Sequence, residues 1–90
     1  MKTKYTVITG ASSGIGRAVA LKFAERNKNL ILIARRKNLL EDLKSEILKK
    51  NPNLDILAID FDLTDVNKIP ELYSKLNNYH IETLINNAGF

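Results

Sequence analysis

Short continuous apolar runs recur along the chain, separated by stretches in which apolar residues are spaced more widely. Runs rich in β-branched and aliphatic residues predict buried strands at 5–9, 30–34, 54–59 and 82–86. The run at 30–34 contains no polar residue, which is typical of a central parallel strand covered on both faces.

The stretches between these runs have helical spacing. The first predicted helix follows Gly14 and frays near 27–29. It is apolar on most sides, through Ile15, Ala18, Val19, Leu21, Phe23 and Ala24. We therefore expect it to be largely covered, packed between a sheet and a further layer.

Two more helices are predicted downstream. Asn38 and Glu41 have the spacing of a capping box, and Pro52 ends the helix that follows them. The third helix is expected to begin near Pro70, where the missing N–H costs little. Its expected inner face consists of Leu72, Tyr73 and Leu76.

Strands that alternate with helices at this spacing predict right-handed crossovers and a parallel sheet. The fold class is therefore α/β, and residues 1–90 form one domain without a linker. A chain of this length buries only about 60 to 65% of its unfolded surface, so we expect modest stability.

Composition narrows the function classes. The chain has no cysteine and a single histidine, His80, which argues against disulfides, thiolate chemistry and a metal site. The net charge of +4 comes from basic residues interleaved with acidic ones, a pattern that favours a solvated surface over nucleic-acid binding. Without a signal-like or membrane-length apolar segment, a cytoplasmic location is the default expectation.

A glycine-rich turn connects the first strand to the first helix. The segment Thr-Gly-Ala-Ser-Ser-Gly-Ile-Gly covers 9–16 and has three glycines. At a helix N-terminus, glycines let backbone N–H groups approach a phosphate, and Ser12 and Ser13 add hydroxyl donors. The spacing is the reverse of the common dinucleotide fingerprint, and a tight turn can need glycine for steric reasons alone.

The segment resembles the nucleotide turn of the short-chain dehydrogenase/reductase family, Thr-Gly-x-x-x-Gly-x-Gly. Two further motifs match that family in order: Asp-Leu-Thr-Asp at 62–65, and Asn-Asn-Ala-Gly at 86–89. The resemblance covers the whole chain. It implies a Rossmann-type doubly wound parallel sheet, about four strands in the order 3-2-1-4, with helices on both faces. It also implies hydride transfer between a nicotinamide cofactor and a carbonyl or alcohol substrate.

The resemblance further implies a set of cofactor-binding residues. In the turn they are Gly10, Ser12, Ser13, Gly14, Ile15 and Gly16. Asp62 and Leu63 would flank the adenine ring, and Asn87, Ala88 and Gly89 would contact the ribose on the nicotinamide side. A purely structural role for Asn86 and Asn87, closing the strand end by side-chain hydrogen bonds, remains open.

The end of the second strand predicts which cofactor is used. A carboxylate at that position accepts hydrogen bonds from the ribose of NAD and repels a 2′-phosphate. Here Ala34 occupies the position and Arg35 and Arg36 follow. We therefore expect NADP(H), with Arg35 as the main 2′-phosphate ligand and Arg36 as an auxiliary one, against the alternative of two solvated loop charges.

The catalytic residues of the resembled family, a Ser and a Tyr-x-x-x-Lys pair, follow its Asn-Asn-Ala-Gly segment. None of Tyr5, Tyr73 and Tyr79 has a lysine four residues later. We therefore expect no catalytic residue here and an inactive, cofactor-binding part of an enzyme. Alternatives are a non-catalytic nucleotide-binding module and an inert fragment. The pair Tyr79 and His80 precedes the fourth strand, at the sheet end opposite the cofactor, and is expected to be superficial.

Two expectations concern partners. The fourth strand would lie at an unpaired sheet edge, which favours self-association between copies. These residues do not identify the small-molecule substrate, because in the resembled family it is selected by loops that follow the Asn-Asn-Ala-Gly segment.

Overall fold

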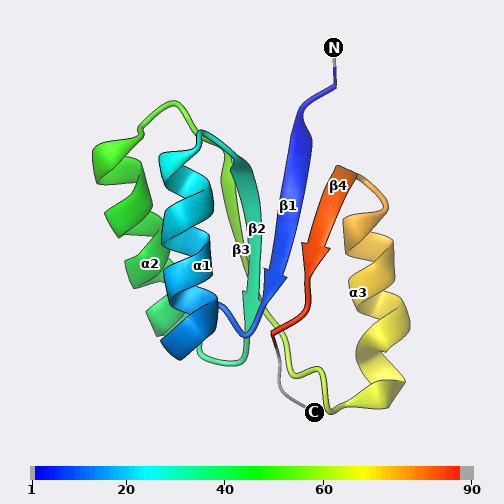
Figure 1. Cartoon of the computed structure of the whole chain (residues 1–90). Coiled ribbons are helices and arrows are strands. Elements are labelled where there is room, and N and C mark those ends of the chain that lie inside the picture. The colour runs from blue at the N-terminus through cyan, green and yellow to red at the C-terminus, as the bar shows by residue number, and fades with distance from the viewer. Residues whose placement is uncertain (1, 88–90) are drawn as a thin grey trace.

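A computed structural model describes residues 2–87, which form a single parallel sheet with helices on both faces. Its elements in chain order are β1 (Lys4–Thr9), α1 (Gly14–Glu25), β2 (Asn29–Ala34), α2 (Lys37–Lys50), β3 (Ile56–Asp60), the 3-10 turn η1 (Val66–Lys68), α3 (Ile69–Leu76) and β4 (His80–Ile85). The strand order is β3-β2-β1-β4, as predicted. All three strand pairs are parallel, so every strand ends at the same edge of the sheet (Figure 1).

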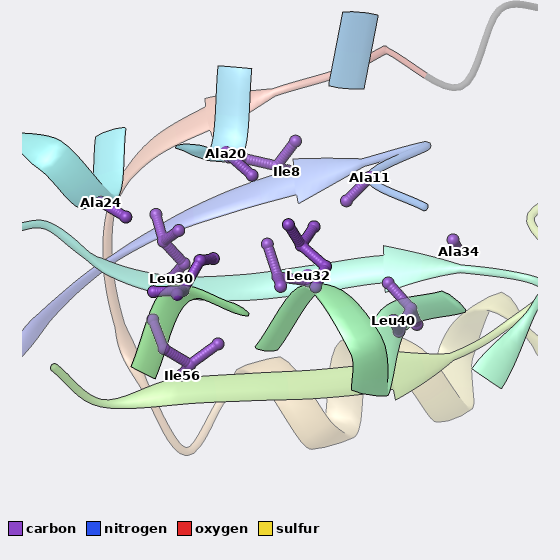
Figure 2. Close-up of a cluster of buried hydrophobic side chains, with 11 residues drawn as sticks. Ile8, Ala11, Ala20, Ala24, Leu30, Leu32, Ala34, Leu40 and Ile56 are labelled. Carbon is purple, nitrogen blue, oxygen red and sulfur yellow. The ribbon is translucent and has the colours of Figure 1, made fainter. Parts of the chain in front are cut away.

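The two faces of the sheet carry separate apolar cores. On the face covered by α1 and α2, Ile8, Leu30 and Leu32 pack against Ala20 and Leu40 (Figure 2). On the opposite face, Tyr5, Val7, Ile31, Ile33 and Ile59 pack with Leu72 of α3. The alternation along β1 and β2 sends successive side chains to opposite faces, and this is why the continuous apolar runs are buried throughout.

The first helix is less covered than its composition predicts. Its buried positions are Gly16, Ala20 and Ala24, one stripe at a spacing of four residues. Ile15 is 73% exposed, so the expectation of a largely covered helix is wrong. Small residues along the stripe let α1 lie close to the sheet, while the ion pair between Arg17 and Glu46 joins its outer side to α2.

The second helix begins without the predicted capping box. Its N-cap residue is Arg36, which makes no side-chain cap hydrogen bond, and Asn38 already lies within the first turn. The reason is the short connection: β2 ends at Ala34, so the chain enters the helix before Asn38 can act as a cap. The helix ends at Lys50, ahead of Pro52, as expected.

The third helix starts one residue before Pro70, in agreement with the prediction. Leu72 is buried and Leu76 half-buried, whereas Tyr73 is 64% exposed, so its assignment to the inner face is wrong. Each residue of an α-helix is turned by about 100° from the one before it, and α3 contacts the core only through a narrow stripe.

Candidate functional site

An open cavity of about 420 Å³ lies at the end of the sheet where the carboxyl-terminal ends of the strands meet. Segments from three connections and from the end of β4 surround it. The lining residues are Gly10, Ser12, Ser13, Ile33, Ala34, Arg35, Arg36, Phe61, Asp62, Leu63, Thr64 and Asn87. The structure thus brings together most of the residues that the sequence singled out. Gly14, Ile15 and Gly16 form the adjoining first turn of α1, and Ala88 and Gly89 lie outside the described residues.

The glycines in the first connection have distinct roles. Gly10 and Gly14 have φ angles of 63° and 58°, in the left-handed region that residues with a Cβ rarely adopt. Gly16 is needed for space, because a Cβ there would lie 2.1 Å from the carbonyl oxygen of Gly10 and 2.8 Å from Nδ2 of Asn87. The first turn of α1 therefore lies tightly against Gly10, the first residue after β1, and against Asn87, which follows β4.

The N-terminus of α1 has the electrostatic character of an anion site. Its N-cap residue, Ser13, makes no side-chain cap hydrogen bond, and the first turn contains no acidic residue. The first N–H groups of a helix have no partner within the helix, and the helix dipole places positive potential there. Because Ser12 and Ser13 also line the cavity, the turn can present several donors to one anionic group.

The connection after β2 supplies two cations to the same cavity. Arg35 and Arg36 are both exposed and line it beside the buried Ala34. Ala34 pairs with Asp60, and its carbonyl oxygen accepts the N–H of Phe61 at 2.8 Å. This pairing continues beyond the end of β3 and holds the Arg35 loop next to the loop that begins at Phe61.

That second loop contains an acidic residue with an ordered side chain. Oδ1 of Asp62 accepts hydrogen bonds from the backbone N–H of Thr64 at 2.9 Å and from its hydroxyl at 2.6 Å. These bonds, and more weakly the positive charge of Arg35, hold the pKa of the Asp62 carboxyl below its usual range. Asp62 therefore remains ionised at neutral pH and acts only as a hydrogen-bond acceptor.

The end of β4 is joined to β1 by one hydroxyl. Thr9 Oγ1 accepts the backbone N–H of Asn87 at 2.9 Å and lies 2.9 Å from Oδ1 of Asn86, to which it can donate. Thr9 is only 6% exposed, so these are interactions of the interior. They support the structural interpretation for Asn86, whose side chain takes part. Asn87 bonds through its backbone N–H, and it also lines the cavity.

Some lining residues were not among those predicted. Phe61 and Thr64 adjoin the predicted pair Asp62 and Leu63, and Thr64 belongs to the motif that identified that pair. Ile33 and Ala34 are strand residues whose place in the cavity wall follows from where β2 ends. Thr9, the first residue of the glycine motif, was not predicted to bond to Asn86 and Asn87. The sequence feature that could have indicated this role is its hydroxyl at the end of the first strand.

Other regions contribute little to this site. His80 is the first residue of β4 and does not precede it, but it lies at the sheet end opposite the cavity, as predicted. Tyr79 is half-buried and packs edge-on against Tyr5, so the expectation that the pair is superficial is wrong for Tyr79. Within residues 2–87, no group of three or more acidic or histidine side chains is arranged to hold a metal ion. None of the helices in this part of the chain has the length and apolarity that a membrane crossing requires.

Comparisons with known proteins agree with this geometry. Residues 4–90 match the family model described as short chain dehydrogenase. Among curated proteins, a putative steroid dehydrogenase 1 from Caenorhabditis elegans is 38% identical over 87 residues, covering 94% of this chain and 28% of the relative. This chain thus spans less than a third of that relative's length.

Solved structures show the same relationship. The bulky-bulky ketone specific alcohol dehydrogenase from Comamonas testosteroni superposes with a TM-score of 0.88 at 37% identity, covering all of this chain and 36% of that one. A short-chain dehydrogenase from Sphingobium yanoikuyae, in complex with NADPH, gives 0.87 at 36% identity, with 97% and 34% covered. With its strand order, its glycine turn and a family match from residue 4 to residue 90, the chain belongs to the short-chain dehydrogenase/reductase family of oxidoreductases.

Proposed function

We propose that this chain binds NADP(H) as the cofactor-binding part of an oxidoreductase that transfers hydride between nicotinamide and a carbonyl or alcohol substrate. The observation that carries the proposal is that the glycine turn, Arg35 and Arg36 all line the same cavity. A diphosphate and a 2′-phosphate are the anionic groups of this cofactor, and the cavity offers a separate set of donors for each.

The diphosphate fits the turn that opens α1. Its glycines keep side chains away from the backbone N–H groups, and the close approach of Gly16 to Gly10 supports a compact cradle. Ser12 and Ser13 add hydroxyl donors at the same wall. Ile15 projects from the first turn with 73% of its surface exposed, which suits contact with a bound ligand.

The 2′-phosphate fits the connection after β2. Ala34 offers no carboxylate to repel it, and Arg35 and Arg36 supply planar donors that match phosphate geometry. Arg35 is proposed as the main ligand and Arg36 as an auxiliary one. The NADPH complex of the Sphingobium yanoikuyae relative supports this choice of cofactor.

The remaining walls suit the adenosine and the second ribose. Asp62 and Leu63 would flank the adenine ring, and Asn87 would contact the ribose on the nicotinamide side. Ala88 and Gly89, which lie outside the described residues, are proposed as further ribose contacts from the sequence motif alone. Bound nicotinamide would supply or accept the hydride. The 90 residues contain no Tyr-x-x-x-Lys pair to move the accompanying proton, so we propose that this chain alone binds the cofactor without turning over substrate.

We also propose that copies of this chain associate along β4. This strand is an edge of the sheet, and its exposed and half-buried residues alternate. Leu84 is 62% exposed, and an unpaired strand edge with an apolar side chain favours pairing with another chain. The other edge strand, β3, has α2 packed along it and more buried residues.

The cofactor proposal is tested by titrating the 90-residue chain with NADPH and with NADH while following nicotinamide fluorescence. We expect tighter binding of NADPH, and Arg35→Ala should lower that preference by about tenfold or more, because charge-assisted hydrogen bonds are lost. Arg26→Ala, at the far end of α1, is the matched control and should leave the preference unchanged. Equal affinities for the two cofactors in the unaltered chain would overturn the assignment.

A further inference from the structure

The two ends of the sheet carry different charge. Each helix runs antiparallel to the strands, so the end opposite the cavity contains the helix C-termini and the starts of the strands, at the top of Figure 1. We call it the basic end. Its basic residues, all exposed, are Lys2, Lys4, Lys22, Arg26, Lys28, Lys49, Lys50 and Lys75. Its acidic residues are Glu25, Asp55 and Glu82.

This distribution makes the chain electrically asymmetric. With eight basic and three acidic residues, the basic end has a formal charge of +5, which exceeds the net +4 of the whole chain. The remaining six basic and seven acidic residues give −1. Along the sequence, basic and acidic residues are interleaved, so the separation of charge arises only when the chain folds.

The acidic residues of the basic end all have partners there. Oε2 of Glu25 lies 3.9 Å from Nζ of Lys22, and Oε2 of Glu82 lies 3.9 Å from Nζ of Lys28. The Asp55 carboxylate accepts a hydrogen bond from the Tyr5 hydroxyl. The other six basic side chains of this end form no ion pair within residues 2–87. Their charge is therefore available to a binding partner.

A local role explains only some of these cations. Basic residues near a helix C-terminus interact favourably with the helix dipole, which accounts for the lysines in the last turns of the three helices. It does not account for Lys2, Lys4 and Lys28, which lie at or before the starts of strands. These residues add charge to the same end without stabilising a helix.

We propose that the basic end is a docking surface for an anionic phospholipid bilayer. Its cations come from all three helices and from the starts of β1 and β2, so they cover an end face of the molecule, and a broad face suits a membrane. Seven of the eight are lysines, which act as point charges. Arg26 is the one guanidinium at this end, whereas nucleic-acid readout relies on several. Docking in this orientation leaves the cavity at the other end open to a water-soluble cofactor.

The proposal predicts that only charges near the membrane matter. A lysine close to an anionic surface strengthens binding by about fivefold. The attraction falls off within a Debye length, about 10 Å at 0.1 M salt. The six residues of β1 alone separate the two ends by about 20 Å. Charges beside the cavity should therefore contribute little.

The test measures co-sedimentation of the 90-residue chain with vesicles of phosphatidylcholine, alone or with about 30% phosphatidylserine. We expect binding to the anionic vesicles only, weakening as salt rises from about 0.1 M to about 0.5 M. Lys49→Gln combined with Lys50→Gln should weaken binding by about twentyfold. Lys37→Gln combined with Lys68→Gln removes the same charge from exposed residues at the cavity end, and as the matched control should change binding by less than about twofold.

A second pair of substitutions guards against unfolding of α2. Lys2→Gln combined with Lys4→Gln removes two charges outside the helices and should weaken binding as much, with circular dichroism confirming that each variant is folded. Equal losses from pairs at the two ends, or equal binding to neutral vesicles, would overturn the proposal. So would binding to duplex DNA at least as tight as to the anionic vesicles, which would assign the basic end to nucleic acid. NADPH titration of the same variants reports on the cofactor proposal separately.

Discussion

Asn87 donates its backbone N–H to Oγ1 of Thr9 across 2.9 Å, although the two residues are 78 positions apart in the sequence. The same hydroxyl lies 2.9 Å from Oδ1 of Asn86. Thr9 is the last residue of β1, and Asn87 follows β4 and lines the cavity. One buried hydroxyl therefore joins the end of the first strand to the wall of the site beside the fourth.

Thr9→Val should destabilise the protein. The substitution keeps the shape but leaves the N–H of Asn87 and the side chain of Asn86 without this partner, at a cost of about 1–3 kcal/mol. Urea denaturation followed by circular dichroism measures the loss. Thr83→Val on β4 is the control and should change the free energy of unfolding by less than about 0.5 kcal/mol. Equal effects of the two substitutions would contradict the bridging role of Thr9.

Alanine substitutions at Gly16 and Gly14 in the glycine turn are expected to reduce stability by different amounts. Gly16→Ala puts a Cβ against the backbone oxygen of Gly10, and since backbone cannot easily move aside we expect a loss of about 3 kcal/mol or more together with loss of NADPH binding. Gly14→Ala meets no atom within 4 Å and only the strain of its φ of 58°, so it should cost about 1–2 kcal/mol. Denaturation midpoints of the two variants, measured side by side, check the order. A reversed order would show that space at Gly16 is not limiting.

Because the pKa of Tyr5 is raised in the folded protein, we expect a loss of stability at high pH. Its hydroxyl donates a hydrogen bond to the Asp55 carboxylate, and this bond, with burial and the negative charge of Asp55, raises the pKa of Tyr5 from 10.0 to about 12. The folded state therefore keeps a proton that the unfolded chain releases at lower pH. The stabilisation is complete below pH 10 and is lost as the pH rises from 10 to about 12.

Denaturation at pH 9 and at pH 11.5 measures this effect. The stability difference between the unaltered chain and Tyr5→Phe should be largest at pH 9 and shrink at pH 11.5. Tyr73→Phe, at a tyrosine that is 64% exposed, is the control and should show no such convergence. A phenolate absorbance titration, compared with that of Tyr5→Phe, in which Tyr5 ionises near pH 10 would count against its raised pKa.

The β4 edge predicts concentration-dependent association. Leu84→Lys places a charge on the exposed edge and should shift the chain towards monomer, because like charges at a strand edge oppose pairing. Sedimentation velocity over a range of concentrations measures the shift. Val66→Lys, at another exposed apolar residue outside the sheet, should leave the association unchanged. An unaltered chain that stays monomeric at high concentration would exclude the proposed contact.

The order of the elements follows from local patterns in the sequence. The apolar run at 30–34 predicts β2 to within one residue, and Pro70 marks the start of α3. These predictions succeed because periodicity and proline act over a few residues, whatever the rest of the chain does. Glycine spacing also predicts where a phosphate could approach, because left-handed φ angles and missing Cβ atoms are local properties.

Helix ends and exposed faces were harder to predict. Asn38 has the residue type and spacing of a cap, but the helix starts at Lys37 because of where β2 ends. Tyr73 and Ile15 are apolar residues at helical spacing, yet both lie mostly in solvent. Whether such a residue is covered depends on which neighbours the sheet provides, and periodicity alone carries no information about them.

The amino-acid sequence by itself determined the alternation of strands and helices, the glycine turn, the family resemblance and the two arginines in place of a carboxylate. Only the tertiary structure decided which side chains meet: Thr9 with Asn86 and Asn87, Tyr5 with Asp55, and the Arg35 loop with the Asp62 loop. The reason is that contacts between residues so distant in the chain depend on strand order and register, which arise when the whole sheet assembles and its two cores are buried together.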